Sequence, residues 1–172
     1  MFRILCFMSF VCLSFGASAQ QLNYQHFTVE DGLPSLTVHQ ITQDDLGYIW
    51  LATDKGLSKY DGYQFQTFTI QNGLSSNDIR EIFVDSENRV WIIGSGKELV
   101  FIKNDQIQKI KTPHKWINIK PKGIHEYEKS VWIDTEEGLF LYEENRLKSY
   151  EIPDSTWEFL GIDEAGIKLF YD

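Results

Sequence analysis

The stretch GYIWLATDKGLSKYDG, residues 47–62, returns as SVWIDTEEGLFLYEEN, residues 130–145, with its Trp 82 positions later. In both copies a Trp is followed six positions later by Gly-Leu and ten positions later by a Tyr. A third Trp lies midway, so that Trp50, Trp91 and Trp132 recur every 41 residues. A strand-rich repeat of about 40–50 residues is typical of the blades of a β-propeller.

Short runs around each Trp predict the strands of these blades. YIWLAT, VWIIG and VWIDT are rich in β-branched and aromatic residues, which favours strands. Their apolar residues are consecutive rather than alternating, which indicates strands buried on both faces. Asp44–Gly47 and Asp61-Gly62 are typical of tight turns between strands. The sequence therefore predicts an all-β fold, a partial β-propeller of about three and a half four-stranded blades whose ring is not closed.

Aligning the copies gives the predicted boundaries. We predict a signal peptide at 1–19 and an incomplete β-propeller at 20–172. The segment 24–29 aligns with the fourth strand of the next repeat, so it is predicted to be the fourth strand of a latch blade. The predicted repeats are blade 1 at 33–70, blade 2 at 74–112, blade 3 at 115–152 and the start of blade 4 at 157–172.

The first residues have the pattern of a secretory leader. Arg3 is followed by an apolar run from Ile4 to Phe15 and then by Ala17-Ser18-Ala19, the small residues after which signal peptidase cuts. The run is shorter than the roughly 20 apolar residues that span a bilayer, so no membrane span is expected in this chain. The expected localisation is the periplasm. The net charge of −9 makes nucleic acid an unfavourable partner.

Residues 32–62, GLPSLTVHQITQDDLGYIWLATDKGLSKYDG, resemble the two-component regulator propeller repeat. That repeat reads roughly G-L-P-S-N-x-V, then I-x-x-D-x-x-G-x-[IL]-W-x-G-T-x-x-G-L-x-x-Y-D. The first copy departs from it at Leu36 and Ala52, and the second copy keeps Asn77 and Gly94 but loses the later Gly-Leu. The resemblance implies the periplasmic sensor of a membrane-spanning regulator, followed in the family by a histidine kinase or another output domain.

The resemblance also implies what the chain binds. In the best-known branch of the family the ligands are oligosaccharides, so an oligosaccharide or similar small ligand is the expected partner. The remaining propeller blades, or another protomer, are expected as protein partners. Two alternatives stay open: a stand-alone secreted propeller that binds or scaffolds, and a truncated remnant without function.

Ligand-binding residues are expected in the loops of one propeller face. By analogy with other propellers, that face carries the connections between blades and those between second and third strands. These loops are small, charged and polar, which suits a sugar and equally suits any exposed turn. The candidates are Asp54, Lys55, Asn77, Lys97 and Glu136.

The remaining repeated residues are expected to be structural. The Trp series should pack in the core, and Gly56 and Gly138 complete the repeat signature. The recurring Asp44, Asp85 and Asp163 should stabilise turns rather than bind metal, because Asp bonds its own backbone there. No catalytic residue, metal site or cofactor site is expected, since no nucleophile elbow, metal-ligand spacing or arginine clamp is present.

Overall fold

The computed structural model describes residues 24–96, 98–110, 121–135 and 138–150, together with the backbone of two further strands at 157–163 and 166–171. The described residues form three four-stranded antiparallel sheets, one two-stranded sheet and two short 3₁₀ helices. Within each four-stranded sheet the strands are hydrogen-bonded in chain order. This arrangement confirms the predicted all-β partial propeller with an open ring, and we call the three sheets blades 1, 2 and 3.

The strands have the following bounds. Blade 1 contains β1 (Val38–Gln43), β2 (Ile49–Thr53), β3 (Gly56–Tyr60) and β4 (Phe65–Phe68). Blade 2 contains β5 (Ile79–Val84), β6 (Val90–Gly94), β7 (Val100–Lys103) and β8 (Gln106–Lys109). Blade 3 contains β9 (Pro121–Tyr127), β10 (Ser130–Thr135), β11 (Gly138–Glu143) and β12 (Arg146–Tyr150). The two-stranded sheet pairs β13 (Trp157–Asp163) with β14 (Gly166–Tyr171).

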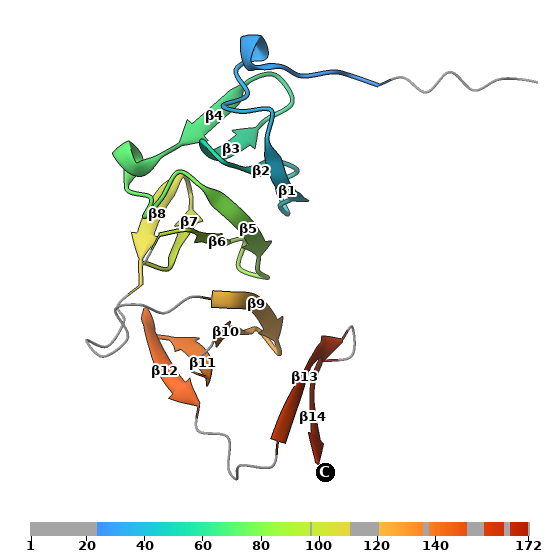
Figure 1. Cartoon of the computed structure of the whole chain (residues 1–172), viewed down its shortest axis with the longest axis vertical. Helices are drawn as coiled ribbons and strands as arrows, with labels where there is room; N and C mark the ends of the chain where they lie inside the picture. The colour runs from blue at the N-terminus through green and yellow to red at the C-terminus, as the bar shows by residue number, and fades with distance from the viewer. Residues whose placement is uncertain are drawn as a thin grey trace, which may run out of the picture.

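The blades follow one another along the long axis of the molecule (Figure 1). The first strands, β1, β5 and β9, gather on one side of this arc, and the fourth strands, β4, β8 and β12, lie on the other. We call β1, β5 and β9 the inner strands. Apolar residues fill the two spaces between neighbouring blades, with Trp50 and Ile79 in one cluster and Trp91 and Phe140 in the other. The core is therefore made by stacking one sheet on the next.

The repeated Trp residues occupy the second strand of each blade. Trp50 and Trp91 are almost fully buried, and each indole N–H donates to the Asp six residues earlier. The Nε1–Oδ2 distances are 2.8 Å to Asp44 and 2.6 Å to Asp85. The same carboxylates accept backbone N–H groups of their turns, as the sequence predicted for Asp. One carboxylate thus serves both the turn and the core.

Blade 3 departs from this pattern, because its Trp is less buried than the other two, although all three were expected to pack in the core. Trp132 is only half-buried, and its Nε1 has no hydrogen-bond partner among the described residues. The preceding hairpin is one residue shorter: Trp132 lies opposite His125, whereas Trp50 lies opposite Thr42, one position farther back along the chain. The shorter turn holds Glu128 and Lys129 at positive φ and brings no Asp to the indole.

The two signature glycines have the backbone that only glycine adopts readily. Gly56 has φ 138° and Gly138 has φ 131°, and each is the first residue of the third strand of its blade. A Cβ on Gly56 would also lie 2.6 Å from the carbonyl oxygen of Phe68. These positions therefore require glycine for structural reasons.

The segment 24–29 is not a strand, which corrects the prediction of a latch strand. Residues 24–28 carry no strand pairing, and Val29 begins the 3₁₀ helix η2 (Val29–Asp31). A strand is held by hydrogen bonds to a neighbour, and in the described part of the chain no strand borders this segment. Phe27 packs instead against the rings of Tyr60 and Phe65, with centroids 4.9 and 5.3 Å away.

Candidate binding site between blades 1 and 2

The predicted loop candidates lie in two separate places. Asp54 and Lys55 are exposed in the turn between β2 and β3, where the Lys55 N–H donates to the Thr53 hydroxyl. Asn77 lies before β5, and its side-chain oxygen accepts the N–H of Ile70, which begins the 3₁₀ helix η3 (Ile70–Asn72). Asn77 therefore has a structural role. Lys97 and Glu136 lie outside the described residues.

The inner strands share a feature that the sequence did not predict. Each carries a β-bulge beside the last residue of its neighbouring strand, and the extra residue is basic each time. In blade 2 the bulged Arg80 donates from Nε and Nη2 to Asp78 Oδ2, and in blade 1 the His39 Nε2 lies 3.5 Å from Asp78 Oδ1. Bulges redirect side chains at sheet edges. The three bulged residues are His39, Arg80 and Lys122.

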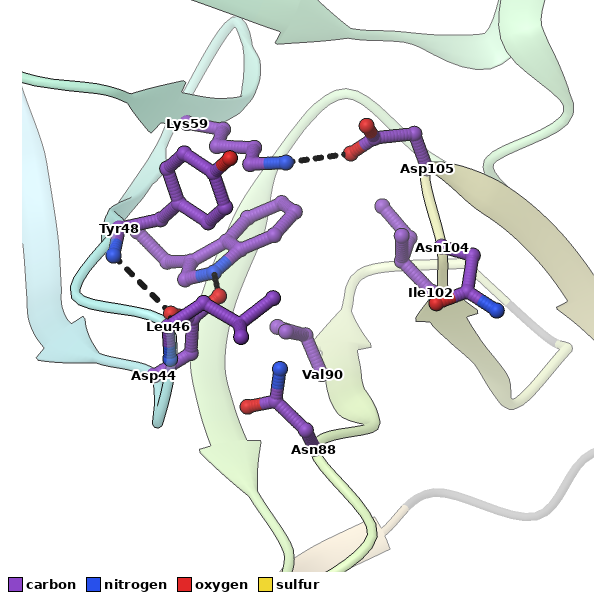
Figure 2. Close-up of a pocket in the computed structure, with 10 residues that line it drawn as sticks. Asp44, Leu46, Tyr48, Lys59, Asn88, Val90, Ile102, Asn104 and Asp105 are labelled. Atoms are coloured by element: carbon purple, nitrogen blue, oxygen red, sulfur yellow. Dashed lines mark hydrogen bonds and ion pairs between the residues drawn. The ribbon is translucent and has the colours of Figure 1, made fainter.

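A hollow lies elsewhere, between blades 1 and 2, where the turns from first to second and from third to fourth strands meet. One part of it is a pocket of about 240 Å³ that is lined by the buried Asp44 and Trp50, and we call this part the deep pocket (Figure 2). Two further pockets of about 190 and 450 Å³ adjoin it toward the fourth strands, and all three share Asp105. We call the three together the interblade groove. Its lining residues are Asp44, Leu46, Tyr48, Trp50, Lys59, Asp61, Gln64, Gln66, Phe68, Asn72, Asn88, Val90, Ile102, Asn104, Asp105, Gln106 and Ile107.

The two walls of the groove come from two different blades. In Figure 2, Asp44, Leu46, Tyr48 and Lys59 come from blade 1, and the opposite wall comes from blade 2. A hydrogen bond from the Asp45 N–H to Asn88 Oδ1, at 3.0 Å, joins the blades at their first turns. The deep pocket therefore lies where two blades already hold each other through polar contacts.

Lys59 is the cation of the groove. Its side chain is 11 % exposed, and its Nζ lies 2.7 Å from Asp105 Oδ1 across the gap between the blades. The same Nζ lies 3.8 Å from the centroid of the Tyr48 ring, a cation–π contact. Figure 2 shows the Lys59 side chain beside the Tyr48 ring and reaching toward Asp105. The ion pair and the ring together fix the position of this charge.

The groove carries more negative than positive charge. Asp44, Asp61 and Asp105 line it together with the single cation Lys59. Hydrogen bonds from the backbone N–H groups of Gln64 and Tyr63 lower the pKa of Asp61, so its carboxylate stays ionised. Amides make up much of the remaining polar lining, in particular Gln64, Gln66, Asn72, Asn88, Asn104 and Gln106.

Reasoning from sequence missed this groove because it placed ligands on the opposite set of loops. The available signal was a pair of asparagines in two turns of blade 2. Asn88 lies in the turn between the first and second strands, Asn104 lies in the turn between the third and fourth strands, and both have positive φ. Within the described ranges, no group of three or more acidic, His or Cys side chains is arranged to hold a metal ion. No helix in these ranges is long and apolar enough to cross a membrane.

Comparison with known proteins agrees with the repeat architecture. Residues 32–55 and 73–96 match the family model of the two component regulator propeller. A stretch of 64 residues is 38 % identical to histidine kinase P4 of Formosa agariphila, which covers 37 % of this chain and 5 % of the kinase.

Solved structures share the fold at low identity. The extracellular domain of a hybrid two component system from B. thetaiotaomicron superimposes with a TM-score of 0.64 at 22 % identity, over 87 % of this chain and 22 % of that domain. Virginiamycin B lyase from Staphylococcus aureus gives a TM-score of 0.54 at 16 % identity, over 81 % of this chain and 58 % of the lyase. These likenesses concern the fold.

The chain spans about a twentieth of the kinase and about a fifth of the extracellular domain. The two matched segments are 41 residues apart and cover equivalent parts of blades 1 and 2. Blades 1 and 2 therefore each carry a match to the two component regulator propeller repeat.

Proposed function

We propose that this chain is part of the sensor propeller of a hybrid two-component regulator, and that it binds a small ligand rather than catalysing a reaction. The observation that carries the proposal is the pair of matched propeller repeats in blades 1 and 2. The stretch of 38 % identity to a histidine kinase supports the same role. The kinase activity of such a regulator would reside in another part of the protein.

The ligand class that we propose is a carbohydrate. The chain offers a groove rich in amides and carboxylates, which exchange hydrogen bonds readily with hydroxyl groups. The leader-like pattern at 1–19 supports a location in the periplasm, where a mature N-terminus at Gln20, read by N-terminal sequencing, is the expected result.

A binding assay against contrasting ligand classes tests the proposal. The purified chain is titrated with oligosaccharides, amino acids and nucleotides. Fluorescence follows the thermal unfolding of the chain, and calorimetry measures the heat of binding. A ligand at about 100 times its Kd stabilises the folded state by about 2.7 kcal/mol, so a true ligand shifts Tm clearly. The expected result is saturable binding of at least one saccharide. Binding confined to another class, or no binding, would contradict the carbohydrate assignment.

The second candidate is a stand-alone secreted propeller that binds or scaffolds. Both candidates place a ligand on the same chain, so binding alone does not separate them. Deleting the gene in its source organism does separate them. Loss of a sensor abolishes the transcriptional response to the bound saccharide, whereas loss of a scaffold leaves that response intact.

A further inference from the structure

We propose that the interblade groove binds an uncharged, hydroxyl-rich chain such as a neutral oligosaccharide, and that it discriminates against acidic ones. This proposal rests on the proposed function, since it assigns the place and the charge class of the saccharide that the sensor binds. One ring would occupy the deep pocket at Asp44 and Asn88, and the following units would run outward past Gln66.

The shape of the groove favours a linear ligand. The pockets of about 240, 190 and 450 Å³ form a row, because the first two share Tyr48 and Lys59, the last two share Gln66, and Asp105 borders all three. The deep pocket is smaller than the roughly 300–1,000 Å³ of sites that hold a whole drug-sized ligand. It therefore suits one unit of a chain better than a large compact molecule.

The polar lining favours hydroxyl groups. A hydroxyl group is both donor and acceptor, and so is the amide of Gln66 or Asn104. Asp105 accepts hydrogen bonds and is 47 % exposed, so it remains open to a ligand while it pairs with Lys59. Leu46 lines the deep pocket and is 72 % exposed, so it offers an apolar surface against which the C–H face of a sugar ring can pack.

The charge of the groove selects against anions. Three carboxylates face one ammonium group, and that ammonium group is already held by Asp105 at 2.7 Å and by the Tyr48 ring. A uronate or sulfate group would meet the ionised carboxylate of Asp61, which accepts backbone N–H groups but pairs with no cation among the described residues. Like charges repel, so an acidic oligosaccharide binds less well than a neutral one.

Equivalent positions in the repeat provide matched controls. Gln66 on β4 and Gln108 on β8 follow Phe65 and Ile107, which pair with Tyr60 and Ile102 at equivalent places in blades 1 and 2. Both glutamines are exposed, but only Gln66 lines the groove. Likewise Asn104 and Asn145 both lie in third-to-fourth-strand turns with positive φ, and Asn104 lines the groove.

The test uses the full chain and four variants. Gln66→Ala and Asn104→Gly remove groove amides, and glycine tolerates the φ of 52° at position 104. Gln108→Ala and Asn145→Gly are the controls. Calorimetry is run with cellotetraose, xylotetraose, laminaritetraose and maltotetraose as neutral probes, and with tetragalacturonate as the acidic probe. Melting curves establish that all variants are folded.

We expect at least one neutral probe to bind the wild-type chain more tightly than tetragalacturonate does. Each groove variant should raise its Kd about threefold to tenfold, the effect of losing one hydrogen bond, while both controls stay within about twofold of wild type. A saccharide that binds all variants equally would overturn the groove and leave the proposed function standing. Preferred binding of tetragalacturonate would overturn the uncharged class. No binding of any probe would overturn this inference and the carbohydrate assignment together.

Discussion

At the residue scale, one aspartate in each of blades 1 and 2 explains the six-residue spacing between Asp and Trp in the repeat. Asp44 accepts the N–H groups of Leu46 and Tyr48 at 3.0 and 2.9 Å and the indole N–H of Trp50 at 2.8 Å. The sequence predicted the turn, because Asp before a Gly-containing loop is typical of one. It did not predict the bond to Trp50, because a spacing of six residues brings the two side chains together only across a bent hairpin.

Replacing Asp44 by Ala should destabilise the chain through its buried indole. The Trp50 N–H would lose its acceptor in a site where the ring is 2 % exposed, and a buried unsatisfied donor costs about 1–3 kcal/mol. Denaturant unfolding followed by Trp fluorescence measures the change. Asp45→Ala is the matched control, since that carboxylate is exposed and its backbone N–H still donates to Asn88. Equal unfolding midpoints for the two variants would contradict this account.

Glu81 on β5 should make stability depend on pH. Partial burial raises the pKa of this carboxyl, and the nearby His125 opposes the shift. At pH values between the ordinary pKa and the raised pKa, the folded state therefore binds more protons than the unfolded state. The free energy of unfolding consequently falls as the pH rises through this window.

Glu81→Gln removes this dependence. The variant should gain stability over wild type at about pH 7 and much less at about pH 4, below the window. Unfolding curves at both pH values provide the measurement, with the exposed Glu128→Gln as control. A gain that is the same at both pH values would point to packing rather than to ionisation.

At the element scale, the positions of the strands could be predicted from the sequence, but the contacts between elements could not. The runs around Trp50, Trp91 and Trp132 became second strands because consecutive β-branched and aromatic residues suit strands covered on both faces. Segment 24–29 aligns with the fourth strand of the next repeat, yet in the described part of the chain no strand borders it, and pairing is not encoded locally. The candidate groove was missed for a related reason: it forms between two blades, from residues such as Lys59 and Asp105 that lie 46 positions apart.

A loop exchange tests the explanation for blade 3. Tyr127–Ser130 is replaced by the five-residue turn Asp85–Arg89, which restores the missing residue and the Asp. The new carboxylate should accept the Trp132 N–H, which has no partner in the present turn, and stabilise the chain by about 1 kcal/mol. The same loop with Asn in place of Asp is the control for loop length. If both loops stabilise equally, the acceptor charge is not the cause.

At the scale of the whole molecule, the same residue type has opposite surroundings in successive blades. Ile41, Ile82 and Ile124 hold equivalent places on the inner strands, opposite Leu51, Ile92 and Ile133. Ile82 and Ile124 are 2 % and 3 % exposed, because each faces the blade before it. Ile41 is 61 % exposed on the face of blade 1 that blade 2 does not cover. The repeat thus prepares this face of blade 1 for a neighbour.

In solution this open face should drive self-association of the isolated chain, because exposed apolar faces and unpaired edges favour contacts between molecules. Light scattering after size exclusion should give a mass above the 20.1 kDa of the chain that rises with concentration. Ile41→Glu should reduce the association and leave the unfolding midpoint almost unchanged, since the side chain is already exposed. Ile82→Glu, at the equivalent buried position, should abolish cooperative unfolding because it places a charge in the core between blades 1 and 2. A wild-type chain that stays monomeric at every concentration would show that the open face of blade 1 needs no cover, and the contrast between Ile41 and Ile82 would then reflect position in the arc alone.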